Sequence, residues 1–280
     1  MQYPVFDNHV HLQMNGENVF SAKRFEKAGG KILNICNIPK MQEPKDINYF
    51  IEQYNSIIKI ADMVKNETNL KVLISIGPYP VDLIKAMELL GNENAKYLFM
   101  KAIDIAIKYI EDGKANAIGE IGRPHFPVSK EIWNTSNEII LYAMEEVKSK
   151  KIPLILHTES ADESVFSDLA KLADRANIDK NFVIKHFSPP LVLEKENHGI
   201  FPSVISSRDN IRIAIKKGFR FFMETDYLDD PDKKGAVMDI TTVPKRFKML
   251  EQENRDLLEK YSFELKNNLF RIYGLEWKEF

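Results

Sequence analysis

The fold of this chain can be worked out from Asp7-Asn8-His9-Val10-His11, a short polar stretch near its N-terminus. It follows Tyr3-Pro4-Val5-Phe6, whose residue types favour a β-strand. Because side chains alternate along a strand, His9 and His11 would leave the same face. Two neutral imidazoles at that spacing can bind one transition-metal ion. A His-x-His pair also occurs in ordinary loops, so a metal site requires further ligands elsewhere in the chain.

Strand-like and helix-like segments alternate along the rest of the chain. Short apolar runs indicate strands, whereas apolar residues recurring every three to four positions indicate helices. After the strand that leads into His9, the predicted strands are 32–38, 70–76, 115–120, 152–157, 182–186, 203–206 and 219–226. The predicted helices are 18–28, 46–65, 81–90, 95–111, 129–150, 162–176 and 210–217, with helical patterns over most of the remainder to 274. This alternation predicts an α/β protein of the (β/α)8 TIM-barrel type.

Length and composition are compatible with one barrel. The chain has 280 residues, of which 44% are hydrophobic, so it can bury a sizeable core. Composition alone fits either one α/β barrel or two smaller domains. Because the sequence contains no low-complexity linker and no abrupt change in composition, residues 1–280 are predicted to form a single TIM-barrel domain.

Charge and cysteine content limit the partners and the cellular setting. The chain has 39 Lys and Arg against 41 Asp and Glu, and its net charge of -2 gives no general attraction to polyanions. A protein that wraps long duplex nucleic acid by charge alone is therefore disfavoured. The single cysteine, Cys36, excludes an internal disulfide framework and is interpreted as a small buried residue. Without a signal-like segment or an apolar run of about 18 residues, we expect a cytoplasmic protein that does not bind membranes.

Ionisable side chains fall at the ends of several predicted strands. Besides His9 and His11, they are Glu120, His157, His186 and Asp226. In a parallel barrel the carboxyl ends of all strands open on one face, so these side chains would converge there. An ionisable residue at the end of a buried strand is costly unless it is paired or ligated. Four histidines and two carboxylates are enough to bind two divalent ions, with one carboxylate bridging them.

These residues lie in motifs that resemble those of the TatD-type metal-dependent hydrolases, within the amidohydrolase superfamily. The motifs are Asp7-Asn8-His9-Val10-His11-Leu12, Ala117-Ile118-Gly119-Glu120-Ile121-Gly122, Leu154-Ile155-Leu156-His157-Thr158, Ile184-Lys185-His186-Phe187-Ser188, Met223-Glu224-Thr225-Asp226 and Asn268-Leu269-Phe270-Arg271-Ile272-Tyr273-Gly274. They run in order from residue 7 to residue 274 and cover nearly the whole chain. Each motif alone is weak, but the set is specific.

The resemblance implies a TIM barrel with one or two divalent ions. By analogy with the family, the first ion would be bound by His9, His11 and Asp226, the second by His157 and His186, and Glu120 would bridge the two. Members of the family hydrolyse phosphodiester bonds in DNA, several of them as 3′ to 5′ exonucleases. The resemblance therefore implies DNA or a small-molecule phosphoester as the substrate, although the net charge gives this no support.

The ligand types narrow the choice of metal and suggest a mechanism. Imidazole-rich sites suit zinc, manganese, iron, cobalt or nickel better than magnesium or calcium. We expect zinc first, with manganese, iron, cobalt, nickel or magnesium as alternatives. A divalent ion lowers the pKa of bound water, so a metal-activated hydroxide would be the nucleophile. The predicted catalytic residues are Asp226, as ligand and proton acceptor, and the bridging Glu120.

Two loops depart from the family pattern. The family usually continues Gly-Leu-Asp-Tyr after the glutamate, whereas this chain has Gly122-Arg123-Pro124-His125-Phe126, and Ser188 is followed by two prolines where a Ser-Gly pair is usual. We predict Arg123 and His125 as substrate contacts. The planar guanidinium of Arg123 suits phosphate or carboxylate, and His125 could reach the substrate or the leaving group. The alternatives are a salt-bridged surface arginine and a bystander loop histidine. Glu224 and Asp7 are predicted to orient the metal ligands.

Other functions are compatible with some of these residues. A PHP-type phosphoesterase also begins with a His-x-His strand, but it typically closes with an Asp-x-His pair, and here Tyr227-Leu228 follows Asp226. A small-molecule amidohydrolase or lactonase would use the same ligands, often with a carboxylated lysine in the bridging role of Glu120. The non-enzymatic alternatives are a metal-binding scaffold or sensor and a nucleic-acid binder, although no sequence signature of a nucleic-acid-binding module is present. No feature of the sequence predicts an oligomeric state.

Overall fold

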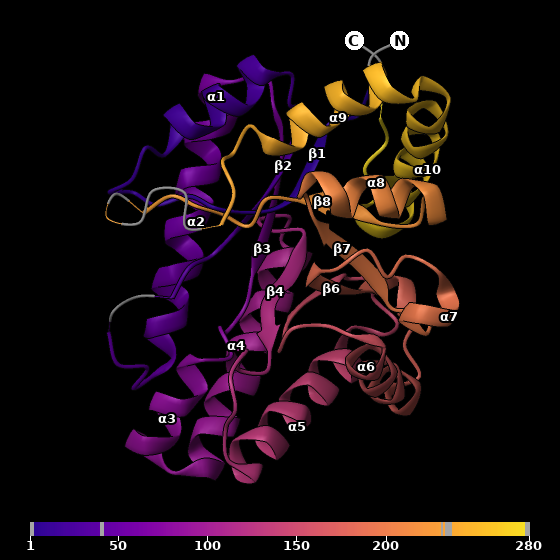
Figure 1. Ribbon diagram of the computed structural model, residues 1–280. Helices are drawn as coiled ribbons and strands as arrows, with labels where there is room; N and C mark the ends of the chain where they lie inside the picture. The colour runs from indigo at the N-terminus through magenta and orange to yellow at the C-terminus, as the bar shows by residue number, and fades with distance from the viewer. Residues whose placement is uncertain (1–2, 40–41, 231, 233–236, 278–280) are drawn as a thin grey trace.

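The strands form one curled, all-parallel sheet in the computed structural model, which describes residues 3–39, 42–230, 232 and 237–277 (Figure 1). The order of strands across the sheet is β8-β7-β6-β5-β4-β3-β2-β1-β9. Their bounds are β1 Phe6–His11, β2 Ile32–Cys36, β3 Lys71–Ile76, β4 Ala117–Gly122, β5 Leu154–His157, β6 Val183–Ser188, β7 Phe201–Ile205, β8 Phe222–Glu224 and β9 Tyr227–Leu228. From β1 to β8, consecutive strands are neighbours, and the sheet is parallel throughout, so the predicted TIM-barrel class is confirmed.

The sheet curls back on itself through a divided last strand. β8 pairs with β7, whereas β9 pairs with β1 through Val10 opposite Tyr227 and His11 opposite Leu228. Between the two segments, Asp226 has a φ of 49°, which turns the chain out of regular extended geometry. The prediction of one strand over 219–226 was therefore wrong in extent, because the local sequence did not reveal the turn at Asp226.

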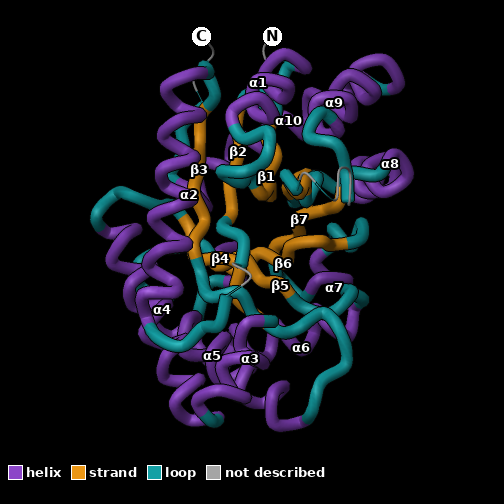
Figure 2. Tube along the Cα trace, turned by 90° about the vertical axis from the view of Figure 1, so that its left-hand side faces the viewer, coloured by secondary structure: helices purple, strands orange, loops and turns teal. Residues whose placement is uncertain are grey.

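Helices cover the outside of the sheet (Figure 2). They are α1 Val19–Ala28, α2 Ile47–Glu67, α3 Asp82–Leu90, α4 Asn92–Glu111, α5 Lys130–Val147, α6 Glu163–Ala176, α7 Glu194–Asn197, α8 Arg208–Lys217, α9 Thr242–Glu253 and α10 Arg255–Tyr273. Side-chain caps fix several starts: Asp46, Ser129 and Asp162 each accept a backbone N–H from the first turn of the following helix. In the described part of the chain, no helix is long and apolar enough to cross a bilayer.

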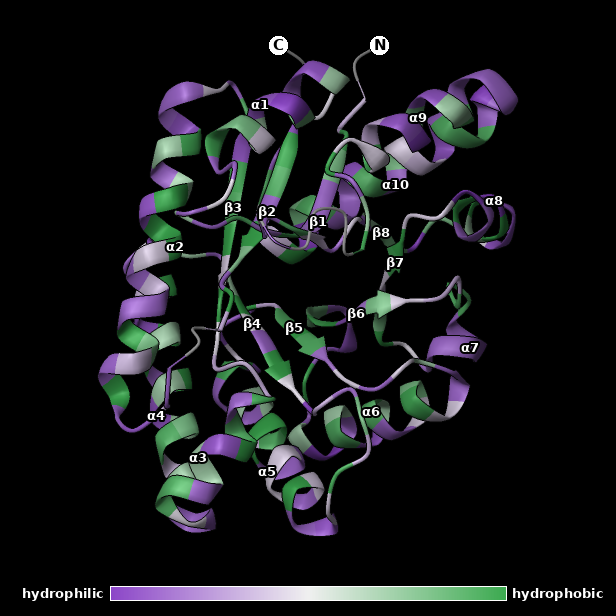
Figure 3. Ribbon diagram, turned by 60° about the vertical axis from the view of Figure 1, so that its left-hand side comes forward, coloured by the Kyte–Doolittle hydropathy of each residue, from purple (hydrophilic) through white to green (hydrophobic). Residues whose placement is uncertain are grey.

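The core lies on both faces of the strands, most of whose residues are hydrophobic (Figure 3). β2 illustrates the alternation: Ile32 and Cys36 belong to the cluster that contains Phe6 and Phe222, whereas Leu33 and Ile35 pack with the helix residues of the other cluster. Strands buried on both faces are nearly continuous apolar runs. Polar and ionisable side chains therefore stand out in these strands.

Candidate metal centre

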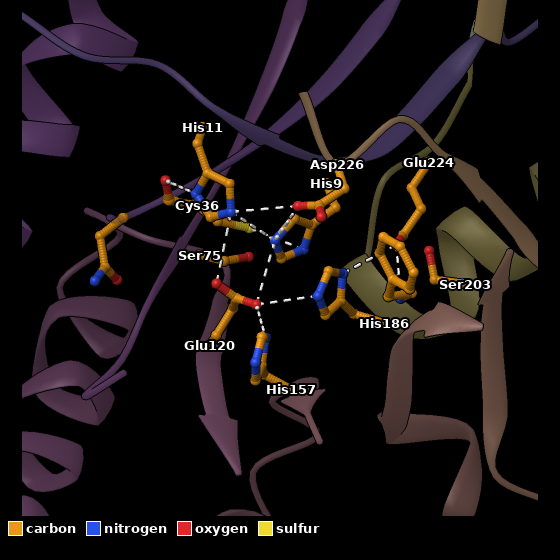
Figure 4. Close-up of polar contacts among 12 residues, drawn as sticks. His9, His11, Cys36, Ser75, Glu120, His157, His186, Ser203, Glu224 and Asp226 are labelled. Atoms are coloured by element: carbon orange, nitrogen blue, oxygen red, sulfur yellow. Dashed lines mark hydrogen bonds and ion pairs between the residues drawn. The ribbon is translucent and has the colours of Figure 1, made fainter. Parts of the chain in front are cut away.

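The ionisable side chains predicted at the strand ends meet at one place (Figure 4). They come from β1, β4, β5, β6 and the turn between β8 and β9, and they are His9, His11, Glu120, His157, His186 and Asp226. His9 has no exposed surface, and the side chains of His157 and Asp226 are 13% and 17% exposed. The site is therefore open to solvent on the side of these last two residues.

Glu120 is at the centre of the cluster. One of its carboxylate oxygens, Oε1, is 2.9 Å from His157 Nδ1, 3.2 Å from His186 Nε2 and 3.6 Å from His9 Nε2. The other oxygen, Oε2, is 3.5 Å from His11 Nε2. Both oxygens of one buried carboxylate thus face imidazole nitrogens, which is the position that a bridging ligand would occupy.

Two groups of side chains have the geometry to bind an ion. His9, His11 and Asp226 form one group and His9, Glu120 and His186 the other, with the ligand atoms of each group within 4.8 Å of one another. His9 Nε2 and His11 Nε2 are 3.1 Å apart, and Asp226 Oδ1 is 3.9 Å and 3.6 Å from them. The first group is the set that the family resemblance implied for one ion. The second group contains His9, whereas the resemblance implied His157 as a ligand of the second ion.

The donor set fits a divalent cation. Burial opposes ionisation of Glu120, but the adjacent His9, His157 and His186 outweigh it and hold the pKa of that carboxyl well below its ordinary value. Among the described residues, the ion pairs of Glu120 are all with histidines. A buried carboxylate surrounded by nitrogen donors that point to a common centre is suited to imidazole-binding transition ions.

A glycine permits the close packing of β4 against β5 beside this cluster. Gly122 has a φ of 143°, and a Cβ added to it would lie 1.9 Å from the carbonyl oxygen of His157. The backbone N–H of Arg123 donates to that same oxygen over 2.8 Å. Only glycine fits here, so the end of β4 is held where Glu120 and His157 can meet.

Neighbouring groups orient three of the histidines. Glu224 Oε1 contacts His186 Nδ1 at 2.9 Å, Cys36 Sγ contacts His9 Nδ1 at 3.4 Å, and the Cys36 carbonyl oxygen is 3.3 Å from His11 Nδ1. In each ring the opposite nitrogen is left to face the centre. Cys36 is buried, as predicted, but its contact with His9 had no signal in the sequence beyond its place at the end of β2. Asp7, which was also predicted to orient the ligands, accepts the backbone N–H groups of His9 and Thr225.

Replacing Glu224 with glutamine is expected to lower the affinity for the metal by about 10- to 100-fold. Glu224 fixes the rotamer of His186 through a charged hydrogen bond, and an amide in its place provides only a neutral one. Competition with a chromophoric chelator measures the affinity. The matched control is Glu88→Gln on the exposed face of α3, which should bind metal as the unmodified protein does. Equal affinity in both variants would show that Glu224 does not orient His186.

Arg123 is fully buried and occupied by protein partners. Its guanidinium donates to both carboxylate oxygens of Glu159, at 3.0 and 3.2 Å, and to Asp168 at 2.6 Å, and it lies over the Trp133 ring. The structure thus places Arg123 in salt bridges, as in the alternative considered from the sequence, but in the interior. A contact between Arg123 and substrate stays a prediction.

His125 lies at the rim of the cluster. Its Nδ1 is 3.0 Å from His157 Nε2, and its side chain is exposed. His157 is therefore contacted by Glu120 on one nitrogen and by His125 on the other. This position is compatible with the predicted substrate contact.

A cavity of about 320 Å³ opens over these residues. It is lined by His157, His186 and Asp226 of the cluster, and by Lys185 among others. Lys185 is only 1% exposed, and its Nζ donates to the carbonyl oxygen of His186. Burial lowers the pKa of Lys185 to about 8, with partial compensation by Glu224, Glu159 and Glu120. Lys185 was not among the residues predicted for the site, although a lysine inside an apolar strand was a visible signal.

Lys185 should make stability depend on pH in the alkaline range. The ordinary pKa is 10.5 and the folded one about 8, so between these values the unfolded chain binds a proton that the folded protein has released. The free energy of unfolding, relative to that of Lys185→Met, should therefore rise with pH across this window by about 3 kcal/mol and stay level below it. Denaturant unfolding at a series of pH values, with chelator present, measures this free energy. The exposed Lys108→Met is the control, and parallel curves for Lys185→Met and the unmodified protein would refute the expectation.

Comparison with known proteins gives three kinds of match. The family model described as TatD related DNase matches residues 6–274. An uncharacterized protein of Methanocaldococcus jannaschii, MJ1127, is 34% identical over 279 residues, which is 98% of this chain and 96% of that protein. Crystal structures of YJJV, a TatD homologue from Escherichia coli, and of a TatD-family hydrolase from Entamoeba histolytica share the fold. Their TM-scores are 0.67 and 0.61, and each is 16% identical to this chain. Each match covers 98% of this chain, with 100% of the Escherichia coli protein and 99% of the Entamoeba histolytica protein.

Proposed function

Because this chain belongs to the family of TatD-related DNases, in the metal-dependent hydrolase superfamily, we propose that it is a divalent-metal-dependent phosphodiesterase that acts on DNA or on a small phosphodiester. The observation that carries the proposal is the position of Glu120. This buried carboxylate contacts four imidazoles that come from three strands. In each of the two groups that share His9, the ligand atoms lie close enough to one another to hold an ion.

The chain's own residues would divide the work as follows. His9, His11 and Asp226 would hold one ion, and Glu120 and His186 would hold a second, with His157 completing it. A divalent ion at such a site lowers the pKa of water and neutralises charge on phosphoryl oxygens. Asp226 lines the cavity and keeps some exposure, so its carboxylate can accept the proton of the attacking water.

A second candidate is a small-molecule amidohydrolase or lactonase. The cavity of about 320 Å³ is at the small end of the range for ligand pockets, and the net charge of -2 offers no attraction to a polyanion. Against it, Glu120 occupies the place where such enzymes often carry a carboxylated lysine. The phosphodiesterase remains our proposal.

The deciding experiment measures hydrolysis of a panel of substrates by the manganese-loaded and the zinc-loaded protein. The panel contains bis(p-nitrophenyl) phosphate, single-stranded DNA, a lactone and a cyclic amide, and Asp226→Asn is assayed beside the unmodified protein. We expect metal-dependent cleavage of the phosphodiesters only. Cleavage of the lactone or amide alone would replace the proposal with the second candidate, and metal binding without any cleavage would favour a scaffold or sensor.

A further inference from the structure

Phe187 has an unusual backbone conformation directly after a candidate ligand. Its φ is 53°, a left-handed value that bulky residues rarely adopt, and its side chain is the one exposed position in β6, at 41%. Its backbone N–H donates to Glu224 Oε1 over 2.6 Å, and the same oxygen contacts His186 Nδ1. The carboxylate oxygen that orients the ligand therefore also accepts the backbone N–H of Phe187, and this second hydrogen bond holds Phe187 in a strained conformation. Strain of this kind is concentrated at functional sites.

The consequence of this conformation is an exposed aromatic ring in the wall of the candidate site. Phe187 lines the same cavity as His157, His186 and Asp226. The protein has other exposed phenylalanines, such as Phe263 on α10, but that side chain lies on a helix and does not line this cavity. Phe187 belongs to neither of the two core clusters, so its partly exposed ring is free to meet a ligand beside the candidate ion ligands. It is well placed to contact the part of a substrate next to the reacting phosphate.

We propose that Phe187 is the surface on which a nucleobase of the substrate stacks while the attached phosphate lies at the metal centre. The proposal rests on the proposed function and narrows its substrate class to unpaired nucleotides that carry a base. In a nucleic acid, the group nearest the reacting phosphate with a planar face is the base. Base–aromatic stacking contributes about 1–3 kcal/mol per base and is tolerant of sequence. The cavity of about 320 Å³ is at the small end of the range for ligand pockets, so a base within a duplex must first leave its stack to enter it.

The test compares substrates that differ only in the base. Metal-loaded protein is assayed on short single-stranded oligonucleotides in which the nucleotide at the cleavage site carries adenine or is abasic. We expect the abasic strand to have a kcat/KM about tenfold lower. Phe187→Ala should lose about tenfold on the adenine strand and nothing on the abasic strand, whereas Phe187→Trp should keep the discrimination. Phe263→Ala is the matched control and should behave as the unmodified protein on both strands.

Binding provides a readout that does not depend on turnover. An oligonucleotide with 2-aminopurine at the same position is titrated with Asp226→Asn, with and without the additional Phe187→Ala change. Stacking on Phe187 quenches the fluorescence, so quenching should disappear in the double variant. Equal losses of kcat/KM on both strands, or unchanged quenching, would overturn the stacking role while the hydrolase proposal stands. Failure of the protein to cleave any phosphodiester would instead refute the proposed function.

Discussion

Replacing Glu120 with glutamine should abolish hydrolysis, with kcat/KM lowered at least about a thousandfold, which corresponds to about 4 kcal/mol. Glu120 contributes both carboxylate oxygens to the cluster, one towards His9, His157 and His186 and the other towards His11. Glutamine keeps the size but removes the charge, and it turns an NH2 group towards imidazole nitrogens that also need an acceptor or a cation. Ion binding in the centre should therefore fall together with activity.

Metal content and kinetics measured on the same preparation check this expectation. Elemental analysis after dialysis counts the bound ions, and circular dichroism shows whether the variant is folded. The control is Glu145→Gln on the exposed face of α5, which makes the same chemical change far from the cluster. A folded Glu120→Gln protein with the ion content and kcat/KM of the control would refute the bridging role.

Replacing Asp226 with asparagine is expected to lower kcat by about 10²- to 10⁴-fold with a smaller effect on KM. Asparagine retains one carbonyl oxygen as a weak ligand for the ion of His9 and His11, but it cannot accept the proton of water. Asp226 is also held by backbone geometry, since its positive φ separates β8 from β9 and turns it towards His9 and His11. The amide should occupy the same position.

Ion content separates the two roles of Asp226. If Asp226→Asn binds the same number of ions and loses kcat, the carboxylate acts as the proton acceptor. If ions are lost in proportion to activity, its contribution is ligation alone, and equal activity of the variant and the unmodified protein would contradict both roles. Asp209→Asn, at a side chain that is 88% exposed on α8, controls for the loss of one carboxylate.

Much of the architecture followed from local patterns. Apolar runs and helical periodicity placed the strands and helices close to their observed positions, because burial and backbone preference act within a few residues. The convergence of His9, His11, Glu120, His186 and Asp226 could be anticipated because parallel strands open at one face of a barrel. That inference needs only the order of the strands and the position of a residue within each.

What the sequence alone determined is therefore the barrel and the set of side chains that meet at its mouth. The tertiary structure decided the rest: the pairing of Arg123 with Glu159 and Asp168, the burial of Lys185, the contact of Cys36 with His9 and the exposure of Phe187. These depend on the direction of each side chain and on partners far away in the chain. A pattern of residue types carries no information about either until the strands have been assembled.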